Sequence, residues 1–213
     1  MAHVGRALVL IALVLPIVTG PSPVWAGAPT DALKSQIDRV LKILEDPELK
    51  KEGKQKDRRT AVRQVANDIF DFSETAKRSL ARHWATRTPA EREEFVQLFS
   101  DLLERSYISK IELYGGERIQ FTGEALEAEN AIVHSRLVTK QGTEIPIDYR
   151  MLKRGDKWLV YDVIIEGVSL VANYRAQFNK IIVTSSYAEL VKKMRDKQEE
   201  FYGAEKQKRT SQR

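Results

Sequence analysis

The spacing of apolar residues changes at about residue 117, from a helical repeat to a strand repeat. Before this point, apolar residues recur three and four positions apart in four segments, which predicts amphipathic helices that each bury one face. After it, apolar and polar residues alternate in four short segments, as in strands with one buried face. The pattern therefore predicts a helical first half followed by a sheet.

Local signals place the ends of the first helices. Thr30 can cap the first one, which should end near Pro47 because proline cannot continue a helix. Thr88–Glu91 combines a capping threonine, a proline in the first turn and a glutamate that completes a capping box. A long helix should follow and stop by Gly115-Gly116. Two further helices are expected between these, around Val62–Phe70 and Ala76–Trp84.

Short turns join the strands of the second half. Gln141-Gly142 and Arg154–Asp156 separate segments that alternate in polarity, and such short connections require antiparallel hairpins. One face of each strand is apolar and available to the helices. We therefore predict an α+β fold in which helices pack on the concave face of a curved antiparallel sheet of about four strands. The strands are expected around Ile119–Phe121 and over Ala131–Thr139, Thr143–Lys153 and Lys157–Glu166.

The last strand leads directly into another amphipathic helix. Strict alternation places Leu159, Tyr161, Val163 and Ile165 on one face and Asp162 on the other. Gly167 then ends the strand, and Ser169 can cap a helix whose apolar residues form one stripe. Strand and helix should therefore meet over a shared apolar interior. A final helix is expected from Ser186-x-x-Glu189.

The N-terminus reads as a secretory signal peptide over residues 1–26, with cleavage near Ala26. An uncleaved membrane anchor is the alternative, but the apolar run is shorter than the roughly 20 residues that span a bilayer. We expect export to the periplasm, a single domain over residues 27–202 and a basic, disordered tail over 203–213. With no cysteine, the exported chain lacks disulfides and must rely on apolar burial.

The charge balance argues against nucleic acid as a ligand. The chain has 35 Lys+Arg and 30 Asp+Glu, and loss of Arg6 with the signal leaves 34 against 30, a net charge of +4. Both signs are interleaved, as on an ordinary solvated surface. The charged segment Glu48–Arg59 is expected to be an exposed connection, and a docking patch for a membrane or partner is the alternative.

No catalytic or metal-binding pattern is present in the sequence. His83 and His134 are far apart, and no nucleophile elbow, zinc motif or phosphate-binding glycine loop occurs. We predict neither cofactor nor metal and no enzymatic activity. The alternative is a cone-shaped enzyme for a small hydrophobic metabolite, with Asp148, Asp162 or Glu166 as acid or base; strand alternation predicts that the two aspartates stay solvated. A domain with a solid core and no ligand is a third possibility.

The sequence of Glu166–Phe178, EGVSLVANYRAQF, resembles the signature of the MlaC, or toluene-tolerance, family of periplasmic phospholipid-binding proteins. The order of elements agrees from about Thr30 to Met194, although Thr184–Ser186 stand where the family usually has a glycine. The resemblance implies a monomeric carrier that holds the acyl chains of a glycerophospholipid as cargo. It also implies two partners, an inner-membrane Mce-domain and ABC transporter complex and an outer-membrane lipoprotein complex, and a role in outer-membrane lipid asymmetry.

The physics of such a cargo constrains the mechanism. Two acyl chains contain about 30 methylenes, so leaving water is favourable by roughly 20 to 25 kcal/mol and spontaneous release is negligible. Transfer must therefore occur while the carrier contacts a partner. Tyr107, Tyr149 and Tyr174 could place hydroxyls at an ester or phosphate. The expected lipid-binding residues are Phe70, Trp84, Phe99, Leu103, Tyr107, Ile147, Tyr149, Val163, Ile165, Val168, Val171, Tyr174 and Phe178.

Overall fold

The computed structural model describes residues 28–211, apart from the side chains of Ser109 and residues 204–211. The expected signal peptide, residues 1–26, lies outside the described residues. The helices are α1 (Ala28–Glu45), α2 (Pro47–Lys50), α3 (Gln55–Ile69), α4 (Phe72–Leu80), η1 (Ala81–His83), α5 (Pro89–Glu112), α6 (Leu170–Thr184) and α7 (Tyr187–Ser211). The strands are β1 (Arg118–Glu127), β2 (Asn130–Val138), β3 (Glu144–Arg154), β4 (Lys157–Ile165) and β5 (Val168–Ser169).

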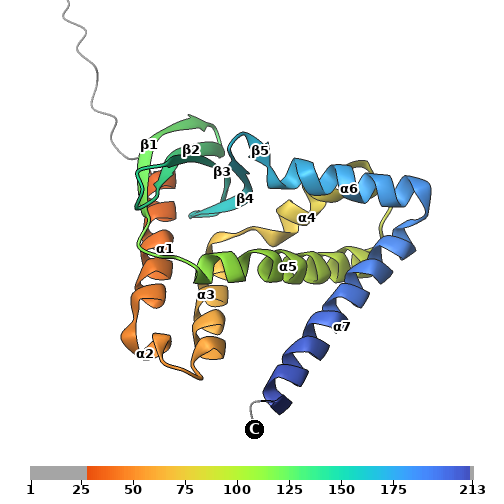
Figure 1. Ribbon diagram of the computed structural model, residues 1–213. Coiled ribbons are helices and arrows are strands. Elements are labelled where there is room, and N and C mark those ends of the chain that lie inside the picture. The colour runs from red at the N-terminus through yellow and green to blue at the C-terminus, as the bar shows by residue number, and fades with distance from the viewer. Residues whose placement is uncertain (1–27, 212–213) are drawn as a thin grey trace, which may run out of the picture.

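The five strands form one antiparallel sheet in the order β1-β2-β3-β4-β5, so every strand pairs with its neighbour in sequence. Figure 1 shows this curved sheet at one end of the molecule, with α1 and α3 running away from it side by side. A second group, α4, α5 and α6, extends from the sheet in another direction. The predicted α+β class and curved antiparallel sheet are confirmed, with the two-residue β5 as the additional strand.

The capping signals in the sequence are confirmed at two helices that matter for the interior. Thr88 Oγ1 accepts from the Glu91 backbone N–H at 3.2 Å, and Glu91 accepts in return from the Thr88 N–H at 2.8 Å. Ser169 accepts from the Ala172 N–H at 3.0 Å and so begins α6. These bonds satisfy N–H groups that have no partner within their own helices.

The alternation predicted for β4 is wrong because this strand contains a bulge. Arg150 pairs with Asp162 and Met151 with Val160, which leaves Tyr161 as an extra residue. A bulge of this kind shifts the alternation by one position. Val160 therefore shares the inner face with Val163. Strict alternation had instead predicted that Val163 shares a face with Leu159 and Tyr161.

The C-terminal helix also differs from expectation. The predicted disordered tail begins at residue 203, but α7 continues to Ser211. Residues 204–209, AEKQKR, are good helix formers, and this propensity favours continuation of the helix. Among the described residues, no helix has the length and hydrophobicity needed to cross a membrane.

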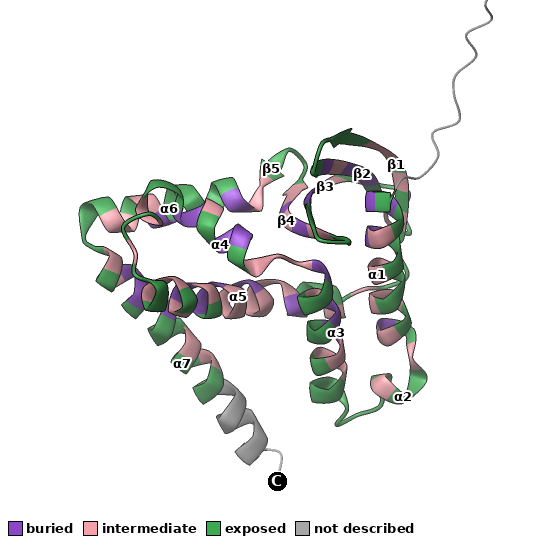
Figure 2. Ribbon diagram, turned by 180° about the vertical axis from the view of Figure 1, so that it is seen from behind, coloured by how far each residue is buried: buried purple, intermediate pink, exposed green. Residues whose placement is uncertain are grey.

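The expected connection at Glu48–Arg59 contains the short helix α2 and the first turn of α3, and residues 50–57 are all exposed. Figure 2 shows exposed positions dominating this end of the α1 and α3 pair. Arg58 and Arg59 turn back to Glu112 at the end of α5, with nitrogen–oxygen distances of 3.4 and 3.0 Å. The stretch is thus solvated at its tip and anchored at its end.

Candidate apolar binding site

Two hydrophobic clusters form most of the interior, and a third, smaller one joins α1, α3 and α5 through Leu44, Val62 and Ile108. The helical cluster joins residues of α4, α5, α6 and α7, with Phe95, Phe99 and Phe178 at its centre. The sheet cluster joins Leu33 of α1 and Ile69 of α3 to the inner faces of β2, β3 and β4. Compact domains usually have one contiguous core, so the division of this interior marks the region between the clusters as the place to look for a ligand.

Partly accessible apolar side chains border both clusters, and we call them the apolar band. They are neither fully packed nor exposed, and the stacked rings of Phe70 and Phe72, 5.6 Å apart, link the two sides. Ile147 belongs with them because it lies two positions before Tyr149 on the same face of β3. The band consists of Phe70, Phe72, Tyr107, Phe121, Ile147, Tyr149, Val163, Leu170 and Tyr174.

Helix α5 and the sheet have different main packing partners. The main packing partners of α5 are α4 and α7, whereas the sheet packs chiefly against α1, α3, α4 and α6. The accessible part of these side chains is apolar surface that no protein group covers. Such surface gains free energy, at about 25 cal/mol per Å², when a hydrocarbon chain displaces water from it.

Tyr149 places a phenol on the inner face of the sheet. Burial raises the pKa of Tyr149 to about 12, and a hydrogen bond with Ser135 opposes part of that rise. Ser135 is itself buried and donates to the Ile147 carbonyl oxygen at 2.9 Å. A phenol with so high a pKa stays neutral at physiological pH and acts as a hydrogen-bond group within apolar surroundings.

The structure divides the predicted lipid-binding residues into three groups. Four are buried in the packed interior, at 1 to 8 % exposure: Phe99, Leu103, Val171 and Phe178. Seven are partly accessible: Phe70, Trp84, Tyr107, Ile147, Tyr149, Val163 and Tyr174. Ile165 and Val168 are exposed at 40 % and 60 %.

Two of these residues lie away from the band. Trp84 follows η1, beyond the end of α4 opposite to the one that adjoins β4, and the Arg92 guanidinium lies 5.4 Å from its ring centre. It packs on the helical cluster but does not bridge the two halves. Val168 pairs with Ile165 in the turn after β4, at the rim of the sheet. The spacing of apolar residues in the sequence indicates that both side chains face inward, but it does not show how far each lies from the band.

Asp162 contradicts the prediction that it stays solvated, because the residue is only 2 % exposed. Its carboxylate accepts from the Ser169 hydroxyl at 2.7 Å, the Val171 N–H at 3.0 Å and Arg150 Nη1 at 3.2 Å. The chain returns after Gly167 and covers the outer face of β4, which alternation alone did not anticipate. With three donors already bound, this carboxylate is a structural anchor for the start of α6.

The other two acid–base candidates lie at the surface. Asp148 is partly exposed and contacts His134 Nδ1 at 2.8 Å on the outer face of the sheet. Glu166 is exposed in the β4–β5 turn with a φ of 50°. Within residues 28–211, no three His, Asp or Glu residues lie close enough to hold a metal ion.

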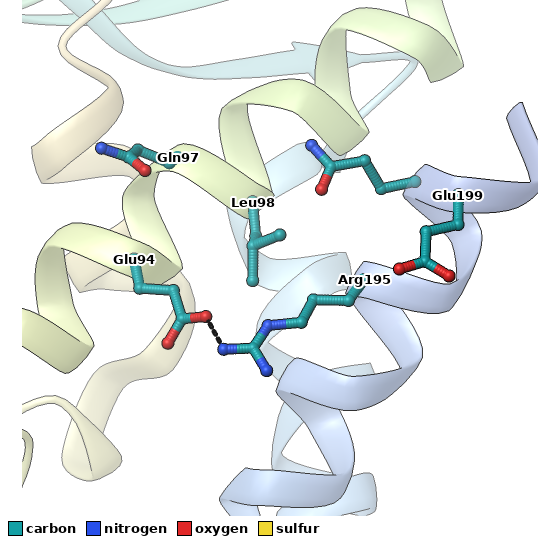
Figure 3. A pocket seen from close by; sticks show the side chains of 6 residues that line it. Glu94, Gln97, Leu98, Arg195 and Glu199 are labelled. Carbon is teal, nitrogen blue, oxygen red and sulfur yellow. Dashed lines mark hydrogen bonds and ion pairs between the residues drawn. The ribbon is translucent and has the colours of Figure 1, made fainter. Parts of the chain in front are cut away.

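Two hollows on the surface lie away from the apolar band. One, of about 260 Å³, lies between α5 and α7, and Figure 3 shows Arg195 reaching across it to Glu94. The other, of about 500 Å³, lies beside α1 and the β3–β4 turn. Charged and polar side chains make up most of the lining of the first hollow and half of the lining of the second, which suits water better than hydrocarbon.

The comparison with protein families decides the assignment. The family model described as MlaC protein matches residues 34–196. The chain belongs to the MlaC family. This match begins in α1 and ends in α7, so it covers the helical cluster, the apolar band and all of the sheet cluster except Leu33.

Two individual proteins support the same assignment. A protein of Haemophilus influenzae, named intermembrane phospholipid transport system binding protein MlaC, is 23% identical over 141 residues, which are 64% of this chain and 66% of that protein. A solved structure of a phospholipid-binding protein from Ralstonia solanacearum, in complex with a phospholipid, is 26% identical with a TM-score of 0.71. That likeness covers 80% of this chain and 96% of the solved chain.

Proposed function

We propose that this protein is a periplasmic carrier that binds the acyl chains of a glycerophospholipid along the apolar band. The observation that carries the proposal is the band itself, a set of apolar side chains left partly accessible between two packed clusters. Its occurrence in an MlaC family member, similar to a structure solved with a bound phospholipid, supports lipid as the occupant.

The proposed mechanism follows from the cost of exposing hydrocarbon to water. Two acyl chains of about 30 methylenes in total lose roughly 20 to 25 kcal/mol on entering water, so the carrier cannot simply release its cargo. Transfer requires a partner that accepts the chains while in contact with the carrier. We propose an inner-membrane Mce-domain and ABC transporter complex and an outer-membrane lipoprotein complex as these partners, with outer-membrane lipid asymmetry as the outcome.

The division of the predicted residues suggests how the cavity is made. Six of the predicted residues are partly accessible members of the apolar band and can contact a ligand as the chain stands. The buried ones, such as Phe99 and Phe178, hold α5 and α6 together through rings whose centres are 5.1 Å apart. We infer that the buried group maintains the walls and that the accessible group contacts the acyl chains.

Analysis of the purified protein tests this function. The protein is exported to a bacterial periplasm, purified without added lipid, and extracted with organic solvent after denaturation. We expect mass spectrometry of the extract to show glycerophospholipid at near-stoichiometric amounts relative to protein. An extract with no lipid, from protein that also fails to take up lipid from vesicles, would refute the proposal.

A further inference from the structure

The aromatic side chains between α5 and α6 change in character along the helices. Phe95, Phe99 and Phe178 are 0 to 4 % exposed, and Phe178 meets the other two rings edge to face, with ring centres 5.1 to 5.5 Å apart. Tyr174 extends this row, with its ring centre 5.0 Å from that of Phe99. Tyr107 follows Phe99 by eight residues on the same stripe of α5. The row thus passes from packed phenylalanines to partly accessible tyrosines.

The tyrosine end of the row lies toward the sheet. The chain enters α6 from β5 and leaves α5 toward β1, so the N-terminal part of α6 and the C-terminal part of α5 are the parts nearest the strands (Figure 1). Tyr174 lies in the first half of α6, and Tyr107 lies in the last turns of α5. Both therefore stand where the helical cluster meets the apolar band.

The hydroxyls of these two tyrosines lack protein partners. Within the described part of the chain, neither Tyr107 nor Tyr174 forms a hydrogen bond to a protein group. Tyr114 and Tyr187 differ, because their hydroxyls donate to Glu45 at 3.3 Å and to the Glu91 carbonyl oxygen at 3.0 Å. Tyr107 and Tyr174 are partly accessible, and neither hydroxyl is among the buried polar atoms without a partner, so both are available to the acceptor oxygens of a ligand.

Two further observations bring polar groups together at this point. Tyr107 of α5 and Tyr174 of α6 pack against the same helical cluster, and burial, with a smaller contribution from Tyr174, raises the pKa of Tyr107. Lys110 is exposed, and its ammonium lies 5.4 Å from the centre of the Tyr107 ring. An exposed cation therefore stands beside the Tyr107 ring.

We propose that Tyr107 and Tyr174 donate hydrogen bonds to the ester carbonyl oxygens of a bound phospholipid, and that Lys110 faces its phosphate. We call these three residues the tyrosine collar. It would fix the depth of the lipid, with the acyl chains along the apolar band and the headgroup at the surface. This inference rests on the proposed function and adds the position of the glycerol part of the ligand.

Lipid release from matched variants tests the collar. Purified protein is loaded with phosphatidic acid or with diacylglycerol carrying the same acyl chains, and the lipid retained is measured after incubation with excess phosphatidylcholine vesicles. The variants are Tyr107→Phe, Tyr174→Phe, their combination, and Lys110→Ala. Tyr187→Phe is the control, because it removes a phenol whose hydroxyl already has a protein partner at the other end of α5.

Each Tyr→Phe change in the collar should speed release of both lipids by roughly 2- to 10-fold, the value of one hydrogen bond. Lys110→Ala should speed release of phosphatidic acid only, because diacylglycerol has no phosphate. Release equal to that of the Tyr187→Phe control would overturn the collar while leaving the carrier function intact. Wild-type protein that loads neither lipid would overturn both.

Discussion

The carboxylate of Asp162 on β4 accepts a hydrogen bond from the backbone N–H of Val171 in the first turn of α6, at 3.0 Å. This contact joins the sheet to the helix that carries Tyr174 and Phe178. It also places a negative charge at the N-terminus of α6, where the helix dipole favours it. The position of α6, and with it one wall of the proposed site, thus depends on a buried acidic residue.

Asp162→Asn should lower the free energy of unfolding by about 2 to 4 kcal/mol, because the neutral amide weakens three hydrogen bonds, one of them to a charged group. Urea unfolding followed by circular dichroism measures the loss. Asp148→Asn is the matched control, since its contact with His134 is partly exposed and should be worth less than about 1 kcal/mol. Equal losses in the two variants would contradict the anchoring role.

Stability at alkaline pH should report on Tyr149. Burial raises the pKa of this phenol to about 12, whereas the unfolded chain releases the proton near pH 10. The contribution to stability is therefore complete below about pH 10 and is lost as the pH rises toward 12, by up to about 1.4 kcal/mol per pH unit.

Tyr149→Phe should accordingly flatten the decline of unfolding free energy above about pH 10. Urea unfolding at a series of pH values measures it, and Tyr202→Phe, at a 54 % exposed position, serves as the control. Burial also raises the pKa of Tyr187 to about 12, so part of the decline should remain in the variant. If the unfolding free energy of the variant fell with pH as steeply as that of the wild type, the pKa of Tyr149 would not be raised in the folded protein.

Truncation of a buried wall residue should mainly lower stability, whereas truncation of a partly accessible lining residue should mainly lower lipid binding. Phe178 contacts Phe95, Phe99 and Tyr174, and Phe178→Ala should cost about 3 to 5 kcal/mol through the cavity that it leaves. Ile147 is already partly accessible, so Ile147→Ala should cost about 1 kcal/mol or less while reducing bound lipid. Urea unfolding and lipid extraction on both variants check this. The reverse order of stabilities would contradict the division into walls and lining.

A strained backbone position offers a stabilising change. Ala81 has a φ of 48° and a ψ of −120° between α4 and η1, a conformation that glycine adopts far more readily. Ala81→Gly should raise the free energy of unfolding by about 1 kcal/mol despite the greater entropy of the unfolded glycine chain. Thermal unfolding measures the change, and a lower midpoint than that of the wild type would contradict the strain.

Local signals predicted most of the fold, and the misses have non-local causes. The capping box at Thr88–Glu91 and the turns at Gly142 and Gly155 depend only on neighbouring residues, so the sequence was sufficient to place α5 and the hairpins. The bulge at Tyr161 and the burial of Asp162 depend on how the chain returns through β5 to cover β4. No periodicity within one strand contains that information.

The same reasoning explains the partial prediction of the site. Helical and strand stripes indicated which side chains face inward, but a stripe has the same appearance in a packed core and in a ligand cavity. Phe99 and Tyr107 lie on one stripe of α5, yet the first is packed on all sides and the second is partly accessible. Both belong to the helical cluster, so only their three-dimensional packing, with Phe99 in its core and Tyr107 at its edge, distinguishes them.

Native mass spectrometry of the exported protein tests the central claim most directly, with two tryptophan variants as a matched pair. Val163→Trp fills the apolar band, whereas Val183→Trp adds the same ring at a 63 % exposed position of α6. We predict that the wild type and Val183→Trp carry the added mass of a glycerophospholipid and that Val163→Trp, although folded, carries little or none. Equal lipid occupancy in the two variants, or a bare protein mass in the wild type after exposure to phospholipid vesicles, would contradict the account.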